Sequence, residues 1–157
     1  MLALLFDMNS LWEEYVLIRL QQTAVEGVTL YGQASKGFWK NISIRPDIVI
    51  EKEVNGVKET FIIDTKWKNI DYSEPSTHDL RQMYVYNDYW NSKKAMLLYP
   101  TKNHSINTPD FNSFHQTENK TTSHECALGK LCIFKEGTLL LDETIGSKIL
   151  GWFEATN

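Results

Sequence analysis

Apolar positions gather in two short runs near the middle of the chain, and these runs predict its central element. The runs occupy residues 48–50 and 61–63, with Asn55 and Gly56 between them. An Asn-Gly pair between two apolar runs is the strongest short-range signal for a β-hairpin. We therefore predict two antiparallel strands within residues 45–68 and expect the rest of the chain to be organised around them.

Helical patterns lie on both sides of this hairpin. Residues 9–25 are apolar around most of the helical circumference, which predicts a buried helix with Asn9 or Ser10 as its N-cap. Ser76 opens a capping-box-like start for a second helix that ends near Trp90. Residues 95–99 form a short apolar run before Pro100 and predict a buried strand. The order strand, strand, helix, strand predicts an α/β fold, with a central mixed β-sheet flanked by α-helices.

The remaining segments give weaker patterns. Residues 28–44 predict a strand or hairpin punctuated by glycines. Residues 101–125 are polar and lack a periodic pattern, which is typical of a functional or disordered loop. A final hairpin is predicted at residues 131–134 and 138–141, followed by an amphipathic helix at 143–153. We expect one domain over residues 1–157, with a core at about 6–100, a polar loop at about 101–127 and a C-terminal hairpin and helix at 128–157.

Composition excludes several classes of protein. With 42% apolar and 23% charged residues, the 157-residue chain has the balance of a soluble globular domain. Its net charge of -4 argues against general binding of polyanions, although a local basic surface is compatible with it. The two cysteines make no disulfide framework, and no apolar run is long enough to span a membrane. We predict a soluble, cytoplasmic protein.

Two acidic residues and a lysine adjoin the central strands. Side chains alternate along a strand, so Asp64 and Lys66 should leave the sheet on one face, with Asp47 beside them at the start of the other strand. Oxygen ligands suit Mg²⁺, for which Mn²⁺ can substitute, and we predict that Asp47, Asp64 and the backbone carbonyl of Thr65 hold this ion. Lys66 would orient or deprotonate an attacking water, or stabilise a pentacovalent phosphate. The alternative is a strand cap at Asp47 and a sheet-edge ion pair between Asp64 and Lys66.

The first predicted helix supplies a further carboxylate. On a helical wheel Glu13 falls among Leu17, Leu20 and Ala24. A carboxylate on a buried face needs a partner or a metal, so we predict that Glu13 completes the metal site. The alternative is an exposed glutamate in the first turn that merely suits the helix dipole.

Two groups of residues are candidates for contacts with nucleic acid. Gln82 and Tyr86 share a polar and aromatic face of the second helix with Asp79 and Tyr89, suited to a metal-bound water, a lysine or a phosphate. Basic and aromatic residues together can follow a nucleic-acid backbone, although more often they form a solvated rim. The basic candidates are Lys36, Lys40, Arg45 and Lys68.

The order of these residues resembles the PD-(D/E)xK nuclease superfamily, which has the restriction-endonuclease-like fold. Pro46 and Asp47, followed by Asp64, Thr65 and Lys66, match its motif. The spacing from Gln82 to Tyr86 is similar to the Q-x-x-x-Y motif of its RecB-like branch. Five segments, at residues 6–16, 44–50, 61–68, 79–86 and 97–100, follow in the order found in the McrC family, the nuclease subunits of McrBC restriction systems.

This resemblance implies a Mg²⁺-dependent DNA endonuclease of a modification-dependent restriction system. Asp47, Asp64, Lys66 and Glu13 would be catalytic, with Gln82 and Tyr86 in support. McrC proteins act with McrB, a GTP-hydrolysing AAA+ motor, through a substantial N-terminal region, and the present sequence begins almost at the nuclease domain. The alternatives are a RecB-like exonuclease or repair nuclease, and a catalytically inactive DNA-binding or assembly module. The target base, the mode of cleavage and the oligomeric state stay open.

Overall fold

The hairpin predicted around Asn55 and Gly56 forms the middle of the structure. The computed structural model describes residues 6–68, 70, 74–104, 108–115 and 123–154. β4 (Ile48–Val54) and β5 (Val57–Thr65) pair in antiparallel register from Ile48 opposite Ile63 to the turn. Asn55 and Gly56 have φ angles of 52° and 76°, and the two-residue turn of such a hairpin requires positive values at both positions. The hairpin prediction is confirmed.

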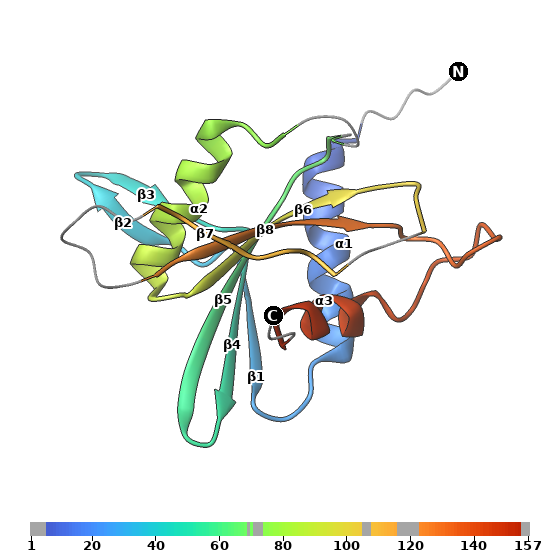
Figure 1. Cartoon of the computed structure of the whole chain (residues 1–157), viewed down its shortest axis with the longest axis horizontal. Helices are drawn as coiled ribbons and strands as arrows, with labels where there is room; N and C mark the ends of the chain where they lie inside the picture. The colour runs from blue at the N-terminus through green and yellow to red at the C-terminus, as the bar shows by residue number, and fades with distance from the viewer. Residues whose placement is uncertain (1–5, 69, 71–73, 105–107, 116–122, 155–157) are drawn as a thin grey trace.

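Further strands extend this hairpin into a mixed sheet. Within the described residues, the strand order is β1-β4-β5-β6-β8-β7, with β1, β4 and β5 antiparallel, β5, β6 and β8 parallel, and β7 antiparallel to β8. β2 and β3 form a separate antiparallel hairpin that projects away from the sheet (Figure 1). The bounds of these strands are β1 Val28–Gly32, β2 Lys36–Trp39, β3 Ile42–Ile44, β6 Lys94–Pro100, β7 Asn112–Ser113 and β8 Glu125–Leu131.

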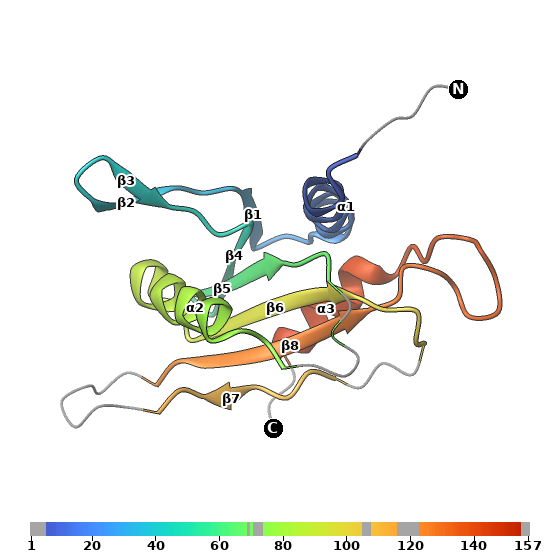
Figure 2. The same ribbon diagram turned by 90° about the horizontal axis from the view of Figure 1, so that it is seen from above.

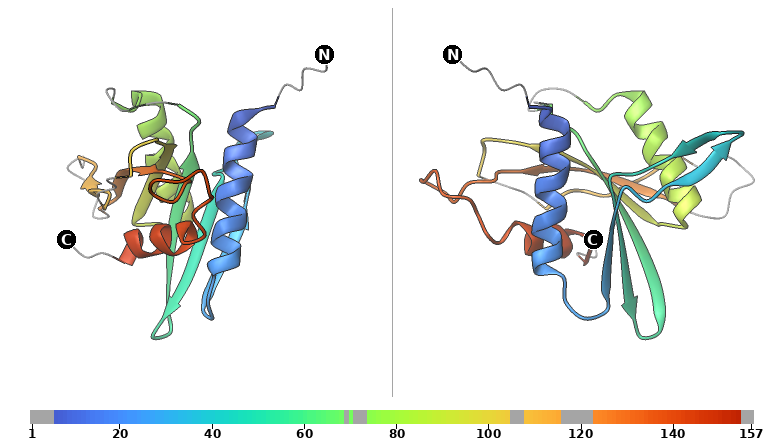
Figure 3. Two further views of the ribbon diagram at one scale, coloured as in Figure 1. Left: turned by 90° about the vertical axis from the view of Figure 1, so that its right-hand side faces the viewer. Right: turned by 180° about the vertical axis from the view of Figure 1, so that it is seen from behind.

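Helices cover both faces of the sheet, as predicted. α1 (Met8–Thr23) and α3 (Ile145–Glu154) share one apolar cluster with Ile48, Ile50 and other side chains of the sheet. α2 (Thr77–Trp90) packs in a second cluster with Val49 and Ile62, which point to the opposite face. α3 lies across the C-terminal end of α1 (Figure 3). The alternating pattern of the central strands therefore supplies two cores, one on each face.

The start and the burial of α1 differ from the prediction. Asp7 is the N-cap, because its carboxylate accepts a hydrogen bond of 3.0 Å from the backbone N–H of Asn9. The prediction of a cap at Asn9 or Ser10 was therefore wrong by two or three residues. Burial all round was also wrong: the sheet covers one stripe of the helix, whereas Leu11 and Ile18 remain 48% and 43% exposed.

The second helix agrees closely with its sequence pattern. Ser76 caps α2, and its Oγ accepts a hydrogen bond of 3.0 Å from the N–H of Asp79. The helix ends after Trp90, where Asn91 adopts a left-handed conformation with φ of 51°. The backbone N–H of Asn91 donates to helix carbonyls that would otherwise lack donors.

The C-terminal third departs most from the prediction. β8 (Glu125–Leu131) begins inside the predicted polar loop and pairs along the full length of β6. The predicted final hairpin is reduced to a single antiparallel bridge, between Phe134 and Leu141. Parts of the predicted loop, residues 105–107 and 116–122, lie outside the described residues. Among the helices of the described part of the chain, none has the length and apolar character needed to cross a membrane.

Candidate active site

The candidate site lies where β4 and β5 separate. Their ladder pairs Ile48 with Ile63, which places Asp47 opposite Asp64 just beyond it. The backbone N–H and the hydroxyl of Thr65 both donate to Asp47 Oδ2, at 2.6 and 2.7 Å. The next residue, Lys66, donates its N–H to the carbonyl of Leu98 in β6. The Asp47 carboxylate therefore replaces the missing strand partner and holds the two strand ends at a fixed separation.

Asp64 is a buried carboxylate close to a second one. Its side chain projects from β5 and the residue is 2% exposed. Its Oδ2 atom is screened from solvent and lies 2.6 Å from Lys66 Nζ. Burial, together with the negative charge of Asp47, raises the pKa of Asp64 to about 6, against the opposing effect of Lys66. The structure thus brings together the three residues of the predicted acidic and basic motif.

Lys66 is held among acidic and amide groups. Besides Asp64, its Nζ atom lies 3.8 Å from Asp79 Oδ1 and donates to Gln82 Oε1 at 3.4 Å. Burial lowers the pKa of Lys66, but the neighbouring carboxylates, Asp64 foremost, outweigh burial and raise it. The side chain is therefore a protonated, positioned cation at neutral pH.

The polar face of α2 forms the rest of the environment of Lys66. Gln82 Nε2 donates to the Tyr86 hydroxyl at 2.7 Å, and that hydroxyl donates to the carbonyl of Arg45 at 2.9 Å. Of the three partners predicted for this face, a metal-bound water, a lysine or a phosphate, the structure provides the lysine. Asp79 was not among the predicted site residues. Its position on the same helical face as Gln82 was the signal that could have identified it.

α1 presents Glu13 next to these strands. The Trp12 indole N–H donates to Leu98 O at 3.2 Å, and Asn9 Oδ1 accepts from the N–H of Trp67 at 3.2 Å. These two bonds fix the first turns of α1 beside the end of β5. Glu13 is partly buried and lies beyond the first turn of α1, so the alternative of an exposed first-turn glutamate is wrong.

Glu13 is tied to the site through Gln33. Gln33 Nε2 donates to Glu13 Oε1 at 2.8 Å, and the backbone N–H of Gln33 donates to the carbonyl of Asp47 at 2.8 Å. Burial raises the pKa of Glu13, and the charge of Asp47 adds to this effect. Among the described residues, no three His, Cys, Asp or Glu side chains are grouped so as to hold a metal ion. Glu13 therefore stays a predicted ligand that this geometry does not group with Asp47 and Asp64.

The predicted basic residues do not converge on Asp64. Lys36 donates to the carbonyl of Tyr89 at 2.7 Å, and the ammonium of Lys40 lies 4.4 Å from the ring centre of Trp39. Lys68 Nζ lies 3.7 Å from Asp79 Oδ2. Arg45 lines a pocket of about 540 Å³ between the β2–β3 hairpin and α2. These cations border the site without entering it.

The donor chemistry of the site fits a hard divalent cation. Mg²⁺ is typically bound through one or two carboxylates and keeps several waters. Asp47, Asp64 and the Thr65 carbonyl present oxygen donors of this kind at one strand end. The raised pKa of Asp64 also indicates that Lys66 compensates its charge only in part, so a bound cation would stabilise the ionised form.

Comparison with known proteins identifies the family. Residues 1–100 match the family model described as McrBC 5-methylcytosine restriction system component. The chain belongs to this McrBC family. A comparison with curated proteins gives no match.

A solved structure shares the fold of this McrBC family member. It is described as a refined half-complex from a tetradecameric assembly of Thermococcus gammatolerans McrB AAA+ hexamers with bound McrC. The similarity has a TM-score of 0.63 at 20% identity and covers 92% of the present chain. It covers 33% of the matched chain, so the present sequence spans about a third of the length of that protein.

Proposed function

We propose that this chain is a Mg²⁺-dependent DNA endonuclease domain of McrC type, with the PD-(D/E)xK fold. The observation that supports it best is the convergence of Asp47, Asp64 and Lys66 where β4 and β5 separate. The same three positions carry the motif of that nuclease superfamily. Membership in the McrBC family agrees with this proposal.

Each residue has a distinct chemical task in this proposal. Asp47, Asp64 and the Thr65 carbonyl would hold the metal ion, which when bound lowers the pKa of a water and polarises a phosphate oxygen. Because its pKa is raised, Lys66 acts as a cation rather than as a base. It donates hydrogen bonds to the attacking water or to a phosphate oxygen and offsets charge that develops there. Gln82, together with Asp79, keeps the ammonium group in place.

We further propose an McrB-type AAA+ GTPase as the partner. The structural neighbour is described as McrB hexamers with bound McrC, and the family model belongs to the same restriction system. The motor would deliver modified DNA to the nuclease. With a net charge of -4, the isolated chain should bind DNA weakly and with steep salt dependence.

Nicking of supercoiled plasmid tests the proposed activity. The native chain is compared with Asp64→Asn and Lys66→Ala in Mg²⁺ or Mn²⁺, with and without an McrB-type partner and GTP. Each variant should lose more than about 100-fold in rate, the usual effect of removing a preorganised electrostatic group. Asp142→Asn and Lys148→Ala are matched controls, because these residues form another ion pair, at 2.5 Å, and should leave nicking unchanged.

Two results would contradict the proposal. The first is absence of cleavage under all of these conditions, combined with no Mg²⁺ binding by calorimetry, which would favour an inactive binding module. The second is cleavage that survives both active-site substitutions. Degradation of linear DNA with no cutting of circular DNA would instead favour a RecB-like exonuclease.

A further inference from the structure

The β2–β3 hairpin combines basic residues with exposed aromatic side chains. Residues 27–46 contain three basic residues and no aspartate or glutamate, whereas the whole chain has a net charge of -4. Phe38, Trp39 and Ile42 on this hairpin are 48%, 58% and 54% exposed. The hairpin extends beyond the sheet into solvent (Figure 2). Large apolar side chains concentrated on a basic, projecting element indicate a binding surface.

The root of the hairpin is fixed to α2. Lys36 donates to the carbonyl of Tyr89 at 2.7 Å, and its ammonium lies 4.8 Å from the ring centre of Trp90. The rings of Phe38 and Tyr89 lie 5.6 Å apart. At the opposite root the Tyr86 hydroxyl donates to the carbonyl of Arg45. The hairpin is therefore positioned by the same helix that carries the polar partners of Lys66.

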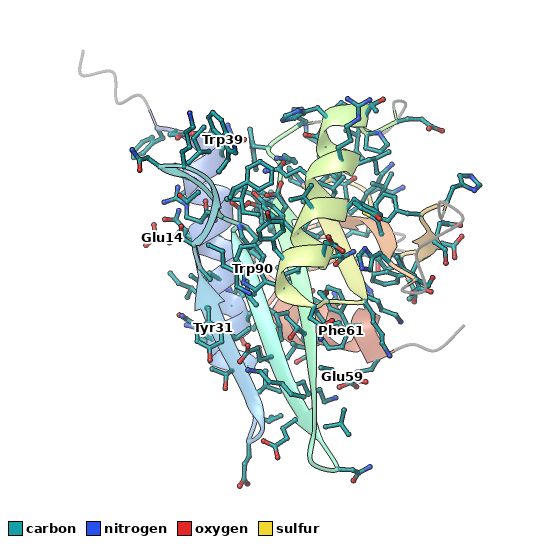
Figure 4. The ribbon with its side chains drawn as sticks, turned by 90° about the vertical axis from the view of Figure 1, so that its left-hand side faces the viewer. Glu14, Tyr31, Trp39, Glu59, Phe61 and Trp90 are labelled. Atoms are coloured by element: carbon teal, nitrogen blue, oxygen red, sulfur yellow. The ribbon has the colours of Figure 1, made fainter. Side chains whose placement is uncertain are left out.

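The tip carries a paired aromatic and cationic group. Lys40 holds its ammonium 4.4 Å from the ring centre of Trp39 and adopts a positive φ of 49° at the turn. Trp39 lies on the projecting hairpin, and Tyr31 lies apart from it on β1 (Figure 4). A ring with one open face and an adjacent cation suits a base or sugar next to a phosphate.

A pocket connects the hairpin with the candidate site. It has a volume of about 540 Å³, a size typical of small-molecule sites. Its lining contains no carboxylate, and Gln82, which bonds to Lys66, forms part of it. The lining residues are Gln33, Ser35, Ser43, Ile44, Arg45, Gln82 and Tyr86. The pocket would thus offer an anionic chain on the hairpin a lining without carboxylates that ends at Gln82, beside Lys66.

We propose that the β2–β3 hairpin is a DNA-binding arm that holds the substrate strand against the candidate site. Phe38 and Trp39 contact bases or sugars, Lys40 and Arg45 contact phosphates, and the pocket accepts the backbone on its way to the site. This inference rests on the proposed nuclease function, because DNA is the polyanion that function requires. The lack of acidic residues in segment 27–46 and in the pocket lining, and the place of Gln82 between the pocket and Lys66, favour DNA over a protein as the occupant.

Fluorescence anisotropy with a short labelled DNA duplex, in Ca²⁺ in place of Mg²⁺, tests the arm. Trp39→Ala should weaken binding about 5- to 150-fold, the range for loss of one aromatic–base contact, without changing the salt dependence. Lys40→Ala and Arg45→Ala should each reduce the slope of log affinity against log salt by about one. Tyr31→Ala and Lys58→Ala, exposed residues away from the hairpin, should bind like the native chain.

The outcomes separate this inference from the proposed function. Native-like DNA binding by the Trp39, Lys40 and Arg45 variants, or no DNA binding by the native chain, would overturn the proposal of a DNA-binding arm. A hairpin variant that no longer binds an McrB-type partner but still binds DNA would also overturn the proposal, because the surface would then be a protein interface. DNA binding that depends on the hairpin, in a chain that never nicks plasmid, supports the arm and overturns the nuclease. Circular dichroism melting verifies that every variant is folded.

Discussion

Replacing Asp64 with asparagine should stabilise the protein at neutral pH, although the substitution removes a residue of the candidate site. The carboxylate is 2% exposed, and burial with the nearby charge of Asp47 raises its pKa to about 6. An uncharged amide of nearly the same shape avoids the cost of ionising a buried acid. The folded protein should therefore be about equally stable with protonated Asp64 and with asparagine, and less stable with ionised Asp64.

The sign and the size follow from linkage between protonation and folding. Above pH 6 Asp64 is ionised in both the folded and the unfolded state, and the folded protein carries the full free-energy cost of the buried charge. Below the unfolded pKa of 3.8 the residue is protonated in both states, so this cost is absent. A shift from 3.8 to about 6, at 1.36 kcal/mol per pKa unit, corresponds to about 3 kcal/mol. The variant should thus gain up to about 3 kcal/mol at high pH, and the gain should disappear between about pH 6 and pH 4.

Urea unfolding across this pH range measures the difference. Both proteins lose stability in acid through their other carboxylates, so only the difference between them reports on Asp64. Asp142→Asn is a control for which the expected change in stability has the opposite sign. Burial raises the pKa of Asp142, but hydrogen bonds from Lys148 and Thr144 outweigh this effect and lower the pKa to about 2. The native chain should therefore be more stable than Asp142→Asn at neutral pH and lose that advantage as the pH falls from about 4 to 2. A constant difference for Asp64→Asn from pH 4 to 8, or greater native stability at pH 8, would show that Asp64 is not destabilised by ionisation in the folded protein.

Three further predictions concern the metal, the α2 network and the α1–α3 contact. Saturating Mg²⁺ should raise the melting temperature of the native chain, with a gain of about 2.7 kcal/mol in the free energy of unfolding at 100 times the Kd, and an equal shift in Asp64→Asn would exclude the predicted ligand. Tyr86→Phe should cost about 1–2 kcal/mol in urea unfolding, since Gln82 and the Arg45 carbonyl lose their shared partner. Gly146→Ala should cost about 1–3 kcal/mol, because its Cβ would meet the Arg19 carbonyl, whereas Gly151→Ala, with open space around it, should be neutral or stabilising.

Local chemistry explains which elements could be predicted from the sequence. The turn at Asn55 and Gly56 and the Ser76 cap each depend on backbone preferences of a few adjacent residues, and both were confirmed. β8 could not be found in this way, because its pattern includes Gly129 and Lys130, which weaken a strand signal. Gly129 belongs there for a tertiary reason: a Cβ would lie 2.6 Å from Met96 Sδ on the neighbouring strand. A contact with a residue distant in the sequence gives no signal in the local sequence pattern.

The same distinction applies to the candidate site. Asp47, Asp64 and Lys66 could be placed together because a hairpin register is nearly determined by its turn. The separation of β4 from β5 was not predictable, since it depends on Thr65 bonding to Asp47 and on Lys66 bonding to β6. Gln33 was missed because a polar residue between a strand and a hairpin gives no signal until the fold brings it to Glu13.

Stability alone does not account for the Asp64–Lys66 pair, and this supports a functional role for the site. The alternative from the sequence combined a strand cap at Asp47, with which the hydrogen bonds from Thr65 agree, and a sheet-edge ion pair, which would be solvent-exposed and nearly neutral in energy. β5 instead lies between β4 and β6, and Asp64 is buried there with its pKa raised rather than lowered. An ion pair that stabilised the fold would lower that pKa, as Lys148 does for Asp142. The buried carboxylate therefore destabilises the folded protein at neutral pH, which is typical of residues whose ionisable group serves binding or catalysis.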